Sequence, residues 1–252
     1  MKLIKLFKII FVLVISLSCS IIFAASTSFT AEQNKAIEQV VHDYLVNNPE
    51  VLVEAMKKLQ EKQEAQMEQE TKKSLTQNAK EIFDASNKPI AGNPKGKIII
   101  AEMFDYRCPH CKVMHPVIEQ IIKANPDLEV IFIEIPIFGE DSEYIVKASL
   151  ASMKQNKYAE FHAALLNSKN TLKKEDILNI AKSIGINIDQ LQKDIENKDL
   201  DKQIEKNIEL AKKMQISGTP AFLIGNLKSK KYDFIYGQTS LDILQAKINA
   251  VK

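Results

Sequence analysis

Cysteine is scarce in this chain, because the 252 residues include only Cys19, Cys108 and Cys111. An exported protein that relies on disulfides for stability carries more cysteines, and a structural zinc site needs about four ligands. Cys108 and Cys111 form one close pair, and no second pair exists to complete such a site. We therefore expect no structural metal and no cofactor, and we expect this pair to carry out redox chemistry.

Long apolar runs are also rare, and the clearest one lies near the start. Residues 1–24 combine three lysines with an apolar run from Ile9 to Phe23, followed by small residues. This layout predicts a secretory signal peptide, and the run is short for a membrane span. A retained membrane anchor is one alternative. Lipidation at Cys19, which would attach the protein to a membrane, is another, although Ser16 stands where lipoprotein signals usually carry leucine.

The chain lacks an excess of either charge. It has 34 basic and 32 acidic side chains, and residues 1–24 hold three of the lysines and none of the acids. The remaining chain, with 31 basic and 32 acidic side chains, is therefore almost neutral. Such a protein has no positive field that would attract nucleic acid or an anionic membrane, so we expect neither as a partner.

The stretch with the clearest chemistry is residues 97–111, KIIIAEMFDYRCPHC. Its apolar and β-branched first half is typical of a buried strand. After the CPHC motif, apolar residues recur at helical spacing from Val113 to Ile122. Proline is favoured in the first turn of a helix, where its missing N–H costs nothing. The sequence therefore predicts a strand-to-helix junction with Cys108 as N-cap and Pro109 as the first helical residue.

This placement predicts a reactive sulfur at Cys108. The free N–H groups and the dipole of a helix N-terminus favour an anion, and the pKa of thiols in such motifs falls from about 8.5 to as low as about 3.5. A stabilised thiolate favours the reduced form, so the disulfide becomes a better oxidant. We expect His110 to add a donor or a positive charge, and Cys111, one turn further, to close or resolve the disulfide.

Residues 26–83 are predicted to form a separate helical module. Thr30 and Gln33 form a capping box pattern, and a second helix starts after Pro49 and continues to about residue 83. Apolar residues follow helical stripes on both helices: Ile37, Val40, Val41, Tyr44 and Leu45, then Leu52, Ala55, Met56 and Leu59. Two short helices cannot bury such stripes alone, so we predict a homo-oligomer, a dimer or a trimer. Packing of the module on its own catalytic domain is the alternative.

The rest of the chain predicts one α/β domain. Residues 84–96 are rich in proline, glycine and asparagine, which is typical of a linker loop. The catalytic domain is predicted over residues 97–252. Strands are expected at 98–104, 128–135, 221–224 and 232–236, with a helical insertion at about 140–215 and a final helix at 241–251. Sequential strands and helices of this kind indicate an α/β architecture.

A strand, a CxxC motif at a helix start, a second strand, and a late Gly218-Thr219-Pro220 before another strand resemble the thioredoxin fold. The CPHC motif and the helical insertion are similar to the DsbA family of periplasmic thiol:disulfide oxidoreductases. The N-terminal module resembles the stalked, self-associating branch of that family, which includes ScsC-type proteins, and the layout of the isomerase DsbC. The fold class implied is a thioredoxin fold with a helical insertion, preceded by a helical oligomerisation module.

The resemblance implies roles for individual residues. Cys108 matches the attacking cysteine, and Cys111 matches its buried partner. Pro220 matches a cis-proline that faces the disulfide, and Thr219 precedes it, where its backbone would pair with an extended substrate. Glu102 matches a buried acid whose raised pKa would let it shuttle the proton of Cys111. The implied partners are exported proteins with cysteines and a membrane redox protein that resets the site in the periplasm.

Three functions stay open on the sequence alone. The first is a protein disulfide oxidoreductase, an oxidase that also isomerises, since CPHC favours oxidation whereas a self-associating stalk and Thr219 favour isomerisation; a dithiol reductase is its variant. The second is a copper or zinc carrier that uses Cys108, Cys111 and His110 or His115, because thiolates suit Cu(I). The third is an envelope structural protein that only keeps the fold, which the intact CPHC motif disfavours.

Overall fold

The computed structural model describes residues 29–169 and 172–252. The predicted signal peptide and Cys19 lie outside these ranges. The chain divides into two compact units between Lys62 and Gln63, and each is described by itself. Over the described ranges, no helix is both long and apolar enough to cross a membrane.

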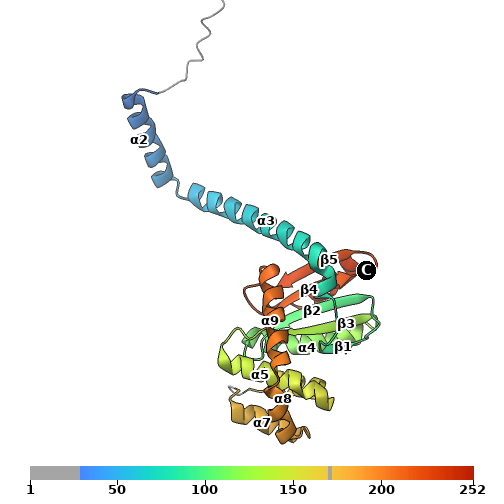
Figure 1. The fold of residues 1–252 in the computed structure, drawn as a ribbon. Coiled ribbons are helices and arrows are strands. Elements are labelled where there is room, and N and C mark those ends of the chain that lie inside the picture. The colour runs from blue at the N-terminus through green and yellow to red at the C-terminus, as the bar shows by residue number, and fades with distance from the viewer. Residues whose placement is uncertain (1–28, 170–171) are drawn as a thin grey trace, which may run out of the picture. The chain divides into compact units, whose positions relative to one another are not determined.

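The first unit contains helix α2, Ala31–Asn47, and the first turns of helix α3, Glu50–Ile82 (Figure 1). The predicted capping box is confirmed: Thr30 Oγ1 accepts from Gln33 N–H at 3.2 Å, and Gln33 Oε1 accepts from Thr30 N–H at 2.9 Å. No residue of α2 is buried. Leu45 and Val51 are half-buried, whereas most large apolar side chains of this unit are exposed: Ile37, Val40, Val41, Tyr44, Val46, Leu52, Val53, Met56 and Leu59.

The last turns of α3 belong to the second unit. Four residues at helical spacing, Thr71, Leu75, Ala79 and Ile82, are buried there. Leu75, Ala79 and Ile82 join a cluster of apolar side chains on one face of the sheet. The second unit therefore begins within the predicted module of residues 26–83, because one face of this end of α3 is apolar enough to pack on the sheet.

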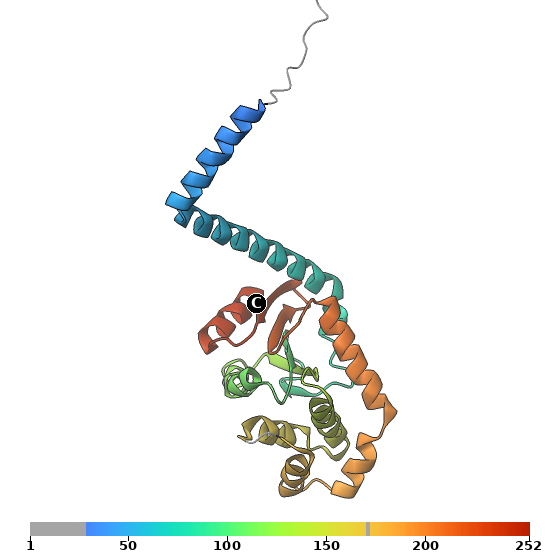
Figure 2. The same ribbon diagram turned by 90° about the vertical axis from the view of Figure 1, so that its left-hand side faces the viewer.

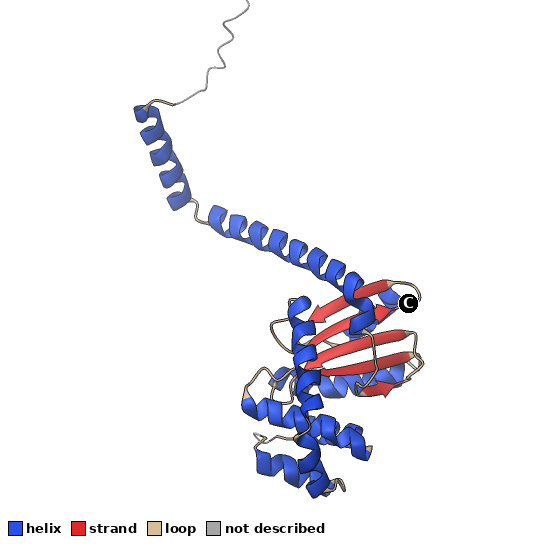
Figure 3. Ribbon diagram, viewed as in Figure 1, coloured by secondary structure: helices blue, strands red, loops and turns tan. Residues whose placement is uncertain are grey.

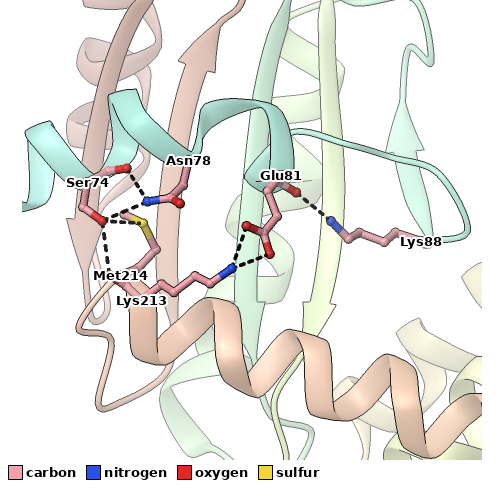
Figure 4. A network of polar contacts seen from close by, with 6 residues as sticks. All are labelled: Ser74, Asn78, Glu81, Lys88, Lys213 and Met214. Carbon is pink, nitrogen blue, oxygen red and sulfur yellow. Dashed lines mark hydrogen bonds and ion pairs between the residues drawn. The ribbon is translucent and has the colours of Figure 1, made fainter.

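Polar contacts fasten this end of α3 to the end of helix α9, Lys198–Lys213 (Figure 4). Ser74 Oγ donates to the carbonyl of Lys213 at 3.1 Å and contacts Met214 Sδ at 3.3 Å. Lys213 Nζ pairs with the Glu81 carboxylate at 2.9 Å. Lys88 Nζ donates to the Glu81 carbonyl at 3.2 Å. These contacts fasten the last turns of α3, the loop after it and α9 to one another within the second unit.

Phe83, directly after α3, packs flat on the sheet. Its ring stacks on Tyr232, with centroids 5.9 Å apart. A Cβ on Gly225 would lie 2.5 Å from the Phe83 ring atoms, so only glycine permits this approach.

One five-stranded sheet forms the centre of the second unit, in the order β1-β3-β2-β4-β5 (Figure 3). Its strands are β1 Ile90–Gly92, β2 Ile98–Phe104, β3 Leu128–Glu134, β4 Ala221–Asn226 and β5 Lys231–Tyr236. Only β2 and β3 are parallel, and the other pairs are antiparallel. β1 corrects the prediction of a loop at 84–96: its three residues are too few to give a pattern, and pairing with β3 makes them a strand.

Helices cover both faces of the sheet, so β2, β3 and β4 are buried throughout. Alternate residues of a strand point to opposite faces. Ile100 and Phe104 of β2 join the core under helix α4, Pro109–Ala124, and helix α10, Leu241–Val251; α4 and α10 lie side by side (Figure 2). Met103 faces the layer of α3 and α9 instead.

The predicted insertion between the second and third predicted strands is helical, as expected, and it joins β3 to β4. Its elements are α5 Glu140–Ser152, a 3-10 turn Met153–Gln155, α6 Tyr158–Asn167, α7 Lys174–Ser183, α8 Ile188–Ile195 and α9. Their apolar faces extend the core beside α4, whereas the end of α9 returns to the opposite face of the sheet. The architecture is therefore the predicted α/β fold with a helical insertion.

Candidate active site

The two cysteines of the CPHC motif lie at the junction of β2 and α4. Cys108 is the N-cap of α4, with φ −72° and ψ 119°, and Pro109 is its first residue, which confirms the predicted junction. Cys108 is 3% exposed and Cys111 is 0% exposed, and both are free thiols. Pro109 and His110 are exposed. Pro109 and His110 therefore form an exposed rim beside the buried sulfur pair of Cys108 and Cys111.

The two thiols differ strongly in acidity. The pKa of Cys108 is lowered to about 5, first by the hydrogen bond from the Cys111 thiol and then by donors from Thr219 and from the backbone N–H groups of Cys111 and His110, against the opposing effect of burial. Burial, and next the hydrogen bond to Cys108, raise the pKa of Cys111. At neutral pH, Cys108 is therefore a thiolate and Cys111 a thiol. The sequence predicted a low pKa for Cys108 but attributed it to the helix end and His110.

Thr219 and Pro220 face the same sulfur. The Thr219–Pro220 peptide bond is cis, as the resemblance implied, and Pro220 is buried. The protonated Cys108 Sγ donates to the Thr219 carbonyl at 3.3 Å. The Thr219 hydroxyl is buried and makes no hydrogen bond among the described residues, and as a donor near the sulfur it favours the thiolate. The structure thus brings the predicted substrate-binding residues to the predicted nucleophile.

His110 is held by a residue that the sequence did not indicate. Its Nδ1 lies 2.9 Å from Oε1 of Gln238, in the loop between β5 and α10. Because an amide oxygen only accepts hydrogen bonds, this contact places a proton on Nδ1. The neighbours of Gln238 also reach the site: Gly237 N–H donates to the Pro220 carbonyl at 2.8 Å, and Thr239 N–H contacts Met114 Sδ at 3.4 Å.

Glu102 is the buried acid of the site. It lies on β2 with 3% of its surface exposed, and burial raises its pKa to about 8. The alternation of β2 places it on the same face as Ile100 and Phe104, under α4. It therefore stays protonated at neutral pH on the side of the sheet where Cys111 is buried, as the prediction for a proton carrier requires.

Asp105 is a second buried acid, which no sequence motif indicated. Its Oδ1 accepts from Arg107 N–H at 2.7 Å and from Ser142 Oγ at 2.9 Å, and its Oδ2 accepts from Ile137 N–H at 2.8 Å. Burial raises its pKa, and these donors oppose that shift. One carboxyl group therefore joins the loop before Cys108 to the loop after β3 and to the start of α5.

The two histidines considered as metal ligands, His110 and His115, each contact another side chain. His115 is buried on α4 with Nε2 3.7 Å from Glu119 Oε1, and burial lowers its pKa. His110 is bonded to Gln238. Within residues 29–169 and 172–252, no three metal-ligating side chains of His, Cys, Asp or Glu come together around one point.

Comparisons with known proteins agree with this arrangement. The family model of the DSBA-like thioredoxin domain matches residues 99–249, and that of the copper resistance protein ScsC N-terminal domain matches residues 33–66. The structure is similar to BcfH of Salmonella enterica Typhimurium, with 29% identity, a TM-score of 0.74 and coverage of 87% of this chain and 96% of that one.

Two further solved structures cover different lengths of the chain. ScsC of Proteus mirabilis in a transitional conformation has 29% identity and a TM-score of 0.62, and covers 88% of this chain and 97% of its own. The thiol-disulfide exchange protein alpha-DsbA2 of Wolbachia pipientis has 31% identity and a TM-score of 0.65, and covers 72% of this chain and 96% of its own. With the thioredoxin fold, the N-terminal ScsC domain and the sulfur pair in place, this chain belongs to the DSBA-like family of thiol:disulfide oxidoreductases.

Proposed function

We propose that this protein oxidises pairs of cysteines in exported proteins and also rearranges wrong disulfides. The observation that carries the oxidase part is the pKa of Cys108, lowered to about 5. Hydrogen bonds to an ionised sulfur exist only in the reduced site, so they stabilise the dithiol form against the disulfide. A disulfide whose reduced form is stabilised is a strong oxidant.

The reaction proceeds by two exchanges that conserve electrons. A substrate thiolate attacks Cys108 Sγ of the Cys108–Cys111 disulfide, the S–S bond breaks, and Cys111 leaves and takes up a proton. A second substrate thiolate then attacks the substrate sulfur of the mixed disulfide and releases Cys108 as a thiolate. The substrate gains a disulfide, and the site gains two electrons. In isomerisation, the Cys108 thiolate instead attacks a substrate disulfide.

The residues around the sulfur pair have supporting roles in this proposal. Glu102, whose burial raises its pKa to about 8, supplies the proton that Cys111 takes up when it leaves. Thr219, next to Cys108, offers its backbone to an extended substrate segment. Pro109 and His110 form the exposed rim that this segment meets first.

The test of the oxidase part uses a reduced substrate with several disulfides, such as reduced ribonuclease, with glutathione disulfide as terminal oxidant. We expect the full chain to restore ribonuclease activity and Cys108→Ala to abolish the effect. Cys111→Ala cannot form the site disulfide and should accumulate mixed disulfides with scrambled ribonuclease, because Cys108 still attacks a substrate disulfide and no Cys111 thiol remains to release it. Traps formed by Cys108→Ala and absent from Cys111→Ala would mean that the two roles are reversed.

The isomerase part depends on self-association of the first unit. Its large apolar side chains are exposed, and residues 33–66 match the ScsC N-terminal domain. A dimer or trimer through these stripes would place two or more sulfur pairs around one substrate. A membrane redox partner in the periplasm would recharge these sites. Export of the chain follows from the predicted signal peptide at residues 1–24.

Deletion of residues 26–62 tests this part. We expect a monomer by light scattering that oxidises dithiols at a similar rate per site and has lost most of its activity on scrambled ribonuclease. The matched control keeps the full length and replaces exposed polar residues Lys57 and Lys58 by glutamine. A monomeric full-length protein, or a truncated protein that still rearranges scrambled ribonuclease, would refute the isomerase part.

Copper transport is the second candidate, and the match to the N-terminal domain of a copper resistance protein favours it. Cys108 and Cys111 are close enough to share a hydrogen bond, and two soft sulfur ligands suit Cu(I) as cargo. Titration of the reduced protein with Cu(I) against a chelator tests this. Loss of tight binding in Cys108→Ser would support it, and binding unchanged by that substitution would exclude the sulfur pair as the copper site.

A further inference from the structure

A pocket of about 670 Å³ opens beside the CPHC motif. We call it the basic pocket. Its lining comes from the loop before α4, the first turn of α4, the end of α6 and the loop that follows: Arg107, Pro109, Lys112, Val113, Leu166, Asn167, Ser168, Lys169 and Leu172. Pro109 follows Cys108 directly, and Lys112 N–H donates to the Cys108 carbonyl at 3.2 Å. The basic pocket is therefore within reach of residues that flank a cysteine bound at Cys108.

The charges in the basic pocket are of one sign. Arg107, Lys112 and Lys169 line it, and none of its nine lining residues is acidic. Arg107 is already neutralised, because its guanidinium pairs with Asp141 at 3.0 Å. Lys112 differs: its Nζ donates to the Ser168 carbonyl at 2.8 Å, and no carboxylate of a described residue pairs with it.

Lys112 is thus an ammonium group that is partly removed from water without a counter-ion. Burial lowers its pKa, which marks the cost of the missing partner. An ammonium group has three donors, and the Ser168 carbonyl uses one. A carboxylate that enters the pocket would gain a charge-assisted hydrogen bond from one of the others.

The remaining lining is apolar. The side chain of Val113 is half exposed, and Leu166 and Leu172 are buried. Together with Pro109 they give the pocket an apolar wall beside its cationic group. A side chain with both a carboxylate and a methylene stem, such as glutamate, matches this combination.

We propose that the basic pocket binds the residue that flanks the reactive cysteine in the substrate, and that it favours an acidic side chain there. This inference rests on the proposed exchange at Cys108 and adds a substrate preference to it. Substrates with glutamate or aspartate beside the cysteine are then oxidised faster than neutral ones, because the contact with Lys112 is made as the mixed disulfide forms.

The same ammonium lies one helical turn from Cys108, so its charge also acts on the sulfur. A pair of substrates that differ only in an acidic or a neutral residue beside the cysteine separates these two effects. An effect on the sulfur changes the rate with every substrate equally, whereas binding of a flanking carboxylate changes only the ratio between the acidic and the neutral substrate.

The experiment uses two synthetic dithiol peptides that differ only in glutamate or glutamine beside the first cysteine, and dithiothreitol as a small neutral dithiol. Oxidation by the full-length disulfide form is followed by stopped flow. We expect the glutamate peptide to react roughly tenfold faster, the lower end of what one hydrogen bond to a charged group allows. Lys112→Met should bring this ratio to about one, and Lys112→Arg should keep most of it. Lys123→Met, on the exposed last turn of α4, is the matched control and should leave it unchanged.

Three results would overturn the inference. They are equal rates for the two peptides with the unmodified protein, a ratio unchanged by Lys112→Met, and a ratio that Lys123→Met removes equally well. If dithiothreitol is oxidised normally in these cases, the proposed function stands and only the basic pocket's role fails. If neither peptide nor dithiothreitol is oxidised, the proposed function itself fails, and this inference falls with it.

Discussion

Replacing Cys111 by alanine tests the origin of the acidity of Cys108. The largest cause that lowers the pKa of Cys108 to about 5 is the hydrogen bond from the Cys111 thiol. Alanine removes that donor and leaves the helix end, the Thr219 contact and His110 in place. Serine at the same position keeps an O–H donor, so Cys111→Ser is the matched control.

The expected size follows from the energy of one hydrogen bond to a charged group, about 1.5–3 kcal/mol. One pKa unit corresponds to about 1.36 kcal/mol, so Cys111→Ala should raise the pKa of Cys108 by about one to two units. Cys111→Ser should raise it by less, because the hydroxyl still donates to the thiolate. His110→Ala should have a smaller effect than Cys111→Ala, since the contribution of His110 to the pKa of Cys108 is its backbone N–H.

Ultraviolet absorbance of the thiolate against pH measures these values, with Cys108→Ser as the blank. A midpoint for the unmodified protein near the ordinary value of a cysteine, 9.0, would remove the physical basis of the oxidase proposal. Equal midpoints in Cys111→Ala and the unmodified protein would show that the helix end and Thr219 do the work, which is how the sequence alone explained it. A pKa shift of Cys108 in Cys111→Ser as large as in Cys111→Ala would mean that the packing of the Cys111 side chain, and not its hydrogen-bond donor, lowers the pKa of Cys108.

Three further predictions concern the groups around the sulfur pair. Glu102 keeps its proton in the folded state up to about pH 8 but loses it near 4.5 when unfolded, so the free energy of unfolding falls as pH rises between these values. Glu102→Gln should therefore raise the free energy of unfolding of the reduced protein, measured in urea, by about 3 kcal/mol at pH 7 and leave it unchanged at pH 4. An equal effect at both pH values would contradict this. Gln238→Met should shift the equilibrium of the disulfide with glutathione in the unmodified protein but not in His110→Ala, and a shift of the same size in both would show that Gln238 does not act through His110. Asp105→Ala leaves buried donors without an acceptor and should cost about 1–3 kcal/mol for each, whereas Ser142→Ala, which removes one donor only, should cost far less by the same urea measurement.

The junction at Cys108 could be predicted because its signals are local. A β-branched run, proline at the first helical position and apolar residues at helical spacing all lie within residues 97–122, and each acts over a few residues. The structure bears out this junction and the cis peptide bond before Pro220. Contacts between residues far apart in the sequence could not be predicted in the same way. Gln238 contacts His110 across 128 residues, and nothing in the composition of the Gln238 loop indicates an active-site contact.

The end of α3 shows a different limit. The sequence assigned it to the separate module of residues 26–83, yet Leu75, Ala79 and Ile82 are buried in the second unit. Their spacing is helical, so the signal was present, but the surrounding lysine, glutamine and glutamate residues obscured it. What decided the outcome was the apolar surface on the sheet and on α9 that they cover, and this surface exists only once the strands have assembled.

One hydrogen bond links the two halves of the proposed chemistry. The Cys111 thiol that donates to the Cys108 thiolate lowers the pKa of Cys108 and raises that of Cys111. It exists only in the reduced site, because in the disulfide both sulfurs are bonded and neither carries a proton. Every time the site is reduced, Cys111 must therefore gain a proton in a place where water is excluded. Glu102, protonated up to about pH 8 and on the α4 side of the sheet, is a buried acid that can supply it. Oxidising power and proton delivery thus depend on the same feature, the burial of Cys111, and a substitution that lets water reach Cys111 should weaken both together.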